Sequence, residues 1–225
     1  MKRTIIVVLG AVALLSLPMR PVGAFPLGFS AVGGIGAGYY SMAELNRHLG
    51  LIAQADNVPL DGIASGVNFR IEGRVWGLNT FGLTGGYERF WGETDAQGTS
   101  SSLSYRTPSD VYTIGAIFVL LRIENVFNLC VGANECFAKS VYGTNELNER
   151  RLSEFKGEDR GYEAYAEIHS NFLNPIEVGM QLGYRGLTID TFNDKYGDVG
   201  YFEPGRKIEI DYSGAFFYFT TAIRL

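Results

Sequence analysis

The last twenty residues, Arg206 to Leu225, limit most strongly what this chain can fold into. Between Tyr212 and Ile223 they contain no charged residue and no proline. One face of an extended chain would carry Ala215, Phe217, Phe219, Thr221, Ile223 and Leu225. The other face is also small or apolar until Arg224, so a strand here would have no polar face. A soluble sheet rarely ends on such a strand, whereas the closing strand of a membrane barrel has this pattern.

The first residues have the pattern of a secretory signal peptide. Lys2 and Arg3 precede an apolar run from Thr4 to Leu17, and a small-residue site, Val22-Gly23-Ala24, follows. The run is shorter than the roughly 20 apolar residues of a membrane-spanning helix. We therefore predict a signal peptide over residues 1–24 and a single mature domain over residues 25–225. An uncleaved N-terminal anchor is the alternative.

The charge of the mature chain bears on its partners. Cleavage after Ala24 removes three basic residues and no acid, so the formal net charge changes from −5 to −8. Nucleic-acid-binding domains present a basic face, so we expect no nucleic-acid partner.

Residues 63–76 give the clearest strand signal in the chain. Apolar and small residues occupy one face, and the other face carries Asn68, Arg70, Glu72 and Arg74. In a soluble sandwich the charged face would point to water. In a membrane barrel the apolar face meets lipid, and the charges turn inward, where they can pair.

Eight strands are predicted in total. They cover residues 30–40, 63–76, 80–93, 110–122, 127–142, 161–172, 176–189 and 206–225. The connections alternate between long and short, and the four prolines between the first and last strands lie in connections, where a missing amide costs no ladder hydrogen bond. This pattern predicts an all-β fold, an eight-stranded antiparallel up-and-down transmembrane β-barrel with long loops outside and both termini in the periplasm.

The first long connection is predicted to contain one short helix over residues 41–53. Ser41 to Glu44 reads as a capping box, and Met42, Leu45, Leu49 and Ile52 follow at helical spacing. Two interpretations remain open: a helix that packs on the barrel rim, and a plug or ligand lid. The charged connection from Gly143 to Asp159 is interpreted as a solvated loop.

The two cysteines lie six residues apart in one predicted strand. An extended strand separates Cys130 and Cys136 by about 20 Å, whereas a disulfide needs Cα atoms within about 7 Å. We therefore expect two unpaired thiols, although a tight turn at Gly132-Ala133-Asn134 would join them. No histidine or third cysteine is near, so we expect no metal site, and we expect no cofactor.

On these strands and connections, the chain from Phe25 to Leu225 resembles the small eight-stranded outer-membrane barrel proteins of Gram-negative bacteria, the OmpA/OmpX-type transmembrane barrel. The resemblance implies a monomer surrounded by outer-membrane lipid and lipopolysaccharide. It also implies that barrel assembly machinery reads the closing strand, with Phe217, Phe219, Ile223 and Leu225 facing lipid. Such a signal usually ends in an aromatic residue, and this chain departs from it with Leu225.

Ten polar side chains are predicted to point into the barrel. They are Arg70, Glu72, Arg74, Glu88, Glu163, Glu167, His169, Glu177, Gln181 and Arg185. Because side chains about fill an eight-stranded lumen, we favour a stabilising network that closes it. The alternatives are a gated polar or proton-sensitive path and a narrow channel for small solutes.

The fold alone does not determine the function, so several classes remain open. We favour a structural or surface-interaction role in the cell envelope, without enzymatic activity. The outer connections carry aromatic residues that would meet a host surface, lipopolysaccharide or another cell. These residues are Tyr105, Phe155, Phe192, Tyr196, Tyr201 and Phe202.

Two further hypotheses use the same strands differently. A barrel-embedded lipid A hydrolase would need His169 and Ser170 with Glu163 or Glu167, but adjacent strand residues point to opposite faces. We therefore assign no catalytic residue. A soluble, lipocalin-like barrel would instead place its apolar face inside and its charges outside.

Overall fold

The computed structural model describes residues 27–57, 59–77, 80–97, 102–124, 126–146, 151–170 and 175–224. The predicted signal peptide, the first mature residues and Leu225 lie outside the described residues. The elements are β1 (Leu27–Tyr40), α2 (Ala43–Asp56), β2 (Ser65–Gly77), β3 (Phe81–Trp91), β4 (Glu93–Gln97), β5 (Ser102–Arg106), β6 (Ser109–Ile123), β7 (Phe127–Glu146), β8 (Arg151–Ser170), β9 (Ile176–Gly186), β10 (Thr188–Ile189), β11 (Phe192–Asn193), β12 (Tyr201–Glu203), β13 (Arg206–Lys207), β14 (Ile210–Asp211) and β15 (Gly214–Arg224). The described part of the chain contains no helix with the length and apolar character of a membrane span.

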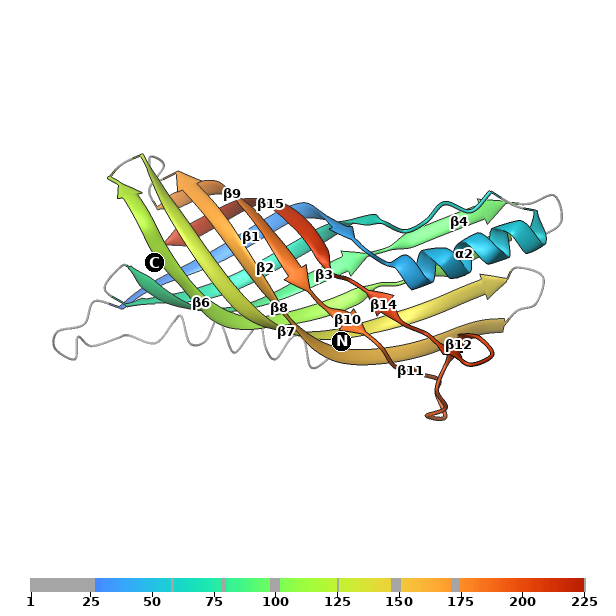
Figure 1. Ribbon diagram of the computed structural model, residues 1–225. Coiled ribbons are helices and arrows are strands. Elements are labelled where there is room, and N and C mark those ends of the chain that lie inside the picture. Colours follow the sequence, from blue (N-terminus) through green and yellow to red (C-terminus); the bar gives the residue numbers. More distant parts are fainter. Residues whose placement is uncertain are drawn as a thin grey trace.

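Eight long strands close into an antiparallel barrel (Figure 1). Their order around it is β1, β2, β3, β6, β7, β8, β9 and β15, and β15 returns to β1. The seam between the first and last strands is paired from Ser30–Arg224 to Tyr40–Gly214. The predicted eight-stranded antiparallel barrel is therefore confirmed, with its closing strand against the first strand.

The faces of the strands have the polarity expected of a membrane barrel. On β2, Val67 is 61% exposed and Ile71 is 49% exposed, whereas Asn68, Arg70 and Glu72 are buried. The apolar side chains thus face outward and the charged ones face the lumen. This arrangement contradicts the lipocalin-like alternative, which requires the reverse.

The wall continues past the barrel at the end where α2 lies (Figure 1). Strands β7 and β8 pair over 20 residues each, up to Glu146–Arg151, and β5 and β4 add to the side of β7. The prediction of a solvated loop over residues 143–159 is therefore wrong. Lys156 and Glu158 are exposed while Tyr142 is buried, so charges and core residues belong to the two faces of one hairpin.

The predicted helix is present as α2, but the predicted capping box is not formed. Met42 precedes the helix in a left-handed conformation, with φ of 39°, and makes no side-chain cap hydrogen bond. The backbone N–H groups of Ser41 and Met42 instead donate to the carbonyl oxygens of Ser213 and Asp211, at 2.9 and 3.0 Å. Contacts with the segment before β15 therefore position the start of the helix.

The structure corrects the start of the closing strand and agrees with the prediction of unpaired cysteines. The closing strand begins at Gly214 rather than Arg206, because residues 206–211 form β13 and β14 and Tyr212 turns into the protein interior. Cys130 and Cys136 both lie within β7, buried and unpaired, so the tight turn that would join them does not exist.

Candidate functional site

The interior of the barrel holds a network of charged side chains. Alternation along β2, β3, β8 and β9 turns these residues inward. Nine of the ten predicted lumen residues are buried, and Glu177 is partly exposed. We call the following residues the lumen network: Arg70, Glu72, Arg74, Glu88, Glu163, Glu167, His169 and Arg185.

One half of the lumen network is centred on Arg185. Its guanidinium group forms two bonds with the Glu88 carboxylate, with Nη1–Oε1 at 2.9 Å, and its Nη2 lies 2.8 Å from Glu163 Oε2. Arg70 Nη2 lies 2.6 Å from Glu163 Oε1, so two arginines share Glu163. These pairs join β9, β3, β8 and β2 across the lumen.

The other half is centred on Arg74. Its Nη1 and Nη2 bind the two oxygens of Glu167 at 2.5 and 2.6 Å, and its Nε donates to Glu72 at 2.6 Å. Glu72 also accepts from Arg70 at 2.8 Å, which links the two halves into one chain of charges. Buried charges persist only where partners satisfy them, and here each arginine has at least two carboxylates.

Neutral groups complete the lumen network. Asn68 Nδ2 donates to Glu88 at 3.0 Å and also contacts the hydroxyls of Tyr40 and Tyr218, and Asn134 Nδ2 donates to Glu163 at 2.8 Å. These bonds add neutral donors to the carboxylates of Glu88 and Glu163. The polar layer therefore acts as a crosslinked unit.

His169 and Glu177 are the predicted lumen residues that lie nearest the end of the barrel where β15 ends. His169 Nε2 lies 2.8 Å from Glu167 Oε1, and Glu177 Oε1 lies 3.4 Å from Arg224 Nη2. Gln181 is buried opposite Glu167. An apolar cluster shares the barrel interior with the lumen network, and the rings of Tyr165 and Tyr218 lie 5.6 and 5.9 Å from Arg70 Cζ. Its members are Trp76, Ile117, Cys130, Tyr165, Phe216 and Tyr218.

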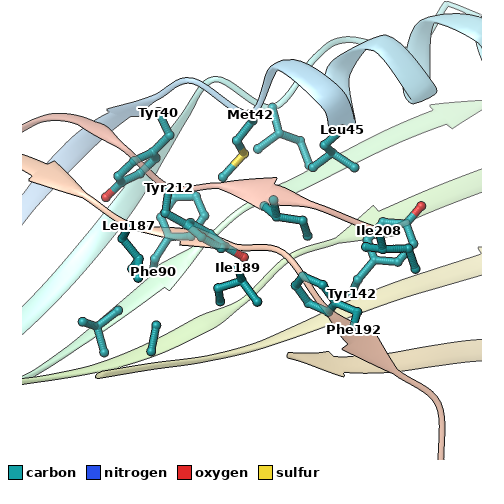
Figure 2. Close-up of a cluster of buried hydrophobic side chains, with 14 of the residues drawn as sticks. Tyr40, Met42, Leu45, Phe90, Tyr142, Leu187, Ile189, Phe192, Ile208 and Tyr212 are labelled. Atoms are coloured by element: carbon teal, nitrogen blue, oxygen red, sulfur yellow. The ribbon is translucent and has the colours of Figure 1, made fainter. Parts of the chain in front are cut away.

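A second, larger apolar cluster lies on the opposite side of the lumen network, toward α2 (Figure 2). We call it the apolar cap. It contains Tyr40, Met42, Leu45, Leu49, Ile63, Phe90, Tyr105, Val111, Cys136, Ala138, Tyr142, Leu187, Ile189, Phe192, Ile208, Ile210 and Tyr212. Burial raises the pKa of Tyr142, whose hydroxyl has no hydrogen-bond partner within the described residues. The cap thus has the character of a dry protein core outside the barrel proper.

Helix α2 closes the apolar cap from one side. Met42, Leu45 and Leu49 are almost completely buried in it, so the apolar face of the helix fills the space between the strands. The helix therefore packs against the strands that extend past the barrel rather than inside the lumen (Figure 1).

The polar face of α2 is joined to the β12–β13 hairpin. Arg47 Nη1 lies 3.2 Å from Glu203 Oε1, and Glu44 Oε2 lies 3.6 Å from Arg206 Nη1. His48 stacks on Phe202 with ring centroids 4.6 Å apart. Burial lowers the pKa of His48, Glu203 opposes that change, and Arg47 adds to it.

The cap also accounts for most of the aromatic residues expected on the outer surface. Tyr105 and Phe192 are buried, and Phe155 and Phe202 are partly buried against the cap. These four side chains therefore pack in or against the cap, because strands that extend beyond the barrel need a core of their own, and contact of the outer connections with a partner stays a prediction. Tyr196 and Tyr201 remain exposed, at 77% and 53%.

The hydrolase arrangement is not assembled. His169 faces the lumen and bonds to Glu167, whereas the adjacent Ser170 lies on the other face of β8. No group of three or more potential metal ligands occurs among the described residues.

The closing strand presents an apolar outer face. Phe219 and Ile223 are exposed, Phe217 is partly exposed, and Phe217 and Phe219 pack edge to face at 4.7 Å between centroids. Leu225, the last residue predicted to face lipid, lies outside the described residues.

This chain forms a closed eight-stranded barrel that is apolar outside and charged inside, which is the fold of the small outer-membrane β-barrel proteins. Among solved structures, the chain is similar to OprG from Pseudomonas aeruginosa, with a TM-score of 0.53 and 10% identity over 90% of this chain and 98% of that one. It is also similar to Ail of Yersinia pestis, with a TM-score of 0.48 and 12% identity over 88% of this chain and 99% of that one. Neisserial surface protein A is similar with a TM-score of 0.48 and 11% identity, over 90% of this chain and 99% of that one. No protein-family model and no curated protein matches the sequence.

Proposed function

We propose that this protein is a non-conducting, non-enzymatic outer-membrane barrel that holds a structured domain on the cell surface for interaction with other molecules. The observation that carries the proposal is the filling of the interior by two successive layers. The lumen network crosslinks the barrel, and the apolar cap closes the end above it. A channel would need a continuous polar path through both layers.

The proposed location is the bacterial outer membrane, reached after cleavage of the signal peptide near Ala24. The outward apolar face of the barrel supports contact with membrane lipid, including lipopolysaccharide. The proposed insertion signal for the barrel assembly machinery is the outer face of β15, with Phe217, Phe219, Ile223 and Leu225. We propose a monomer.

A rigid turn between β11 and β12 supports the surface-interaction role. Asp194 Oδ1 accepts hydrogen bonds from the backbone N–H groups of Tyr196 and Asp198, at 2.8 and 3.0 Å. The Lys195 Nζ atom lies 4.8 Å from the centre of the Tyr196 ring. An exposed tyrosine on a preorganised turn loses little conformational entropy on binding, which favours its use as a contact residue.

Planar bilayer recordings test the absence of conduction. The purified, folded protein is expected to give no stable conductance steps, while an open porin inserted from the same detergent serves as the positive control. Reproducible unitary steps from the folded protein would support the narrow-channel alternative instead.

Fractionation and gel mobility test the location and the fold. The protein is expected in the outer-membrane fraction, and the unboiled, detergent-extracted barrel is expected to migrate differently from the boiled chain. Recovery in the soluble periplasm, or no mobility change, would contradict the proposal. Release of fatty acid from lipopolysaccharide by the folded protein would support the hydrolase alternative.

A further inference from the structure

The outward side chains of β6, β7 and β8 change from charged to apolar at a defined level. Lys139 on β7 is in register with Asp110 on β6 and Glu158 on β8. The next outward row toward the C-terminal end of the barrel contains Tyr112, Phe137 and Arg160. Beyond Glu135, the outward positions of these three strands are uncharged as far as Ile123, Phe127 and Ser170. Aromatic residues mark the interface of membrane barrels, so this level is the boundary between lipid and water.

Arg160 is the basic residue at this boundary that lacks a close partner. Its guanidinium lies over the Phe137 ring, with Cζ 5.2 Å from the centroid, and its nearest carboxylate oxygen, Glu135 Oε1, is 3.8 Å away. That distance exceeds hydrogen-bond range, and within the described residues the guanidinium makes no hydrogen bond. Its side chain is 74% exposed.

The neighbouring cations are engaged more closely. Lys139 Nζ lies 2.7 Å from Glu158 Oε1, and Arg89 Nη1 lies 2.8 Å from Asp110 Oδ1. Arg160 therefore differs from them in holding an open set of donors at the lipid boundary.

The barrel wall two outward rows below Arg160 is lined with small side chains. Ala116, Ala133 and Ala164 are in register on β6, β7 and β8, and Ala166 lies one outward position further along β8. The row between Arg160 and these alanines contains Glu135 and the larger exposed residues Ile114 and Tyr162. Below that row, the strip of alanines leaves room for a hydrocarbon chain to lie against the wall.

We infer that Arg160 binds a phosphate of lipid A in lipopolysaccharide, with an acyl chain along the alanine strip. A guanidinium group matches a phosphate with paired, charge-assisted hydrogen bonds, and the Phe137 ring holds the guanidinium at the boundary. Lys139, in the row above, is already paired with Glu158, so Arg160 is the cation that binds the phosphate, and Glu135 opposes it. The inference names the lipid partner of the proposed outer-membrane protein and rests on that proposed location.

Binding of diphosphorylated lipid A to the folded barrel in detergent micelles, followed by native mass spectrometry, tests this site. Arg160→Gln is expected to weaken binding about tenfold, the scale of one charged hydrogen-bonded contact. Glu135→Gln is expected to strengthen binding, because it removes the opposing charge. Arg106→Gln is the matched control, since Arg106 is an exposed arginine paired with Glu93 at 2.8 Å and should leave binding unchanged.

The remaining outcomes separate the alternatives. Unchanged binding by Arg160→Gln overturns the inference. Weaker binding by Glu135→Gln also overturns it and indicates a metal-bridged lipid. Equal binding of dephosphorylated lipid A indicates apolar contact only, and equal binding of phosphatidylglycerol indicates any anionic lipid; either result overturns the assignment. The gel mobility of every variant measures folding separately from binding. A folded outer-membrane barrel that does not bind lipid A would therefore refute this site without contradicting the proposed function.

Discussion

At the scale of single residues, the buried charges of the lumen depend on one another. Arg185 is almost completely buried and binds both Glu88 and Glu163, so removing it takes the bidentate partner from Glu88 and leaves Glu163 with Arg70 as its cation, all away from water. Burial of an uncompensated charge is more costly than the net gain from the original pair.

Arg185→Met is therefore expected to lower the free energy of unfolding by about 3–5 kcal/mol. Denaturant titration of the folded barrel in micelles measures this loss. Arg106→Met, at an exposed pair, is expected to change the same quantity by less than about 1 kcal/mol. Adding Glu88→Gln to Arg185→Met should recover part of the loss, and an equal loss at the two arginines would contradict this account.

Two glycines of β1 offer a sharper comparison. A Cβ atom at Gly36 would lie 1.8 Å from the carbonyl oxygen of Phe217 across the seam, whereas a Cβ at Gly33 would meet nothing within 4 Å. Gly36→Ala is expected to reduce the fraction of heat-modifiable, folded barrel strongly, because β1 and β15 must separate to admit the methyl group. Gly33→Ala should fold like the parent, and equal folding yields for the two variants would refute the close approach.

At the scale of elements, α2 is held by an apolar face and by a polar contact that includes His48. The pKa of His48 is lowered from 6.5, so the neutral form is favoured in the folded protein. The packing of α2 on the apolar cap is therefore most stable above about pH 6.5, where His48 is neutral. The stability of this packing falls as the pH drops below that value, because protonation of His48 is favoured when the helix is released.

Amide hydrogen exchange in residues 43–56 is therefore expected to be less protected at about pH 5 than at about pH 7.5, after correction for intrinsic rates. His48→Phe keeps a ring against Phe202 and removes the titrating group, so this pH dependence should disappear. Persistence of the same dependence in His48→Phe would show that it does not come from His48.

The sequence predicts some of these elements better than others, for a physical reason. Within the membrane, alternation of apolar and polar residues identifies the strands, as on β2. Outside the membrane, the outward face of a strand meets water, and Lys156 and Glu158 make the β7–β8 hairpin look like a solvated loop. The apolar cap cannot be predicted in this way, because its residues come from nine elements and five connections, and only the fold brings Tyr142 against Phe202.

At the scale of the whole molecule, the protein contains two interior layers that are stabilised in different ways. Charged pairs and the smaller apolar cluster that contains Trp76 hold the layer within the barrel, whereas apolar contacts predominate in the cap. The inward direction of the charged residues could be predicted from alternation, but their pairing could not. Arg70 meets Glu163 from a strand 93 residues away in sequence, and only barrel closure sets that distance.

The two layers are expected to fail separately. Replacing Met42, Leu45 and Leu49 with serine should open the apolar cap and make the region near α2 sensitive to protease, because about 2 kcal/mol of apolar burial is lost at each position. The variant should still show barrel mobility on gels and no conductance, since the lumen network remains. Conductance steps in this variant would show that the cap alone closes the barrel.

Oxidation of the two thiols of β7 is expected to compete with assembly of the barrel. Cys130 and Cys136 are buried in different apolar clusters of the folded protein and are not bonded to each other. On the proposed route the unfolded chain crosses an oxidising compartment, in which both thiols are open to bond formation. A bond between them would force a bend where β7 must run straight, so insertion into the membrane competes with oxidation. Slowing insertion should therefore accumulate an oxidised, assembly-incompetent chain, detectable by thiol labelling and absent in a variant with both cysteines replaced by alanine.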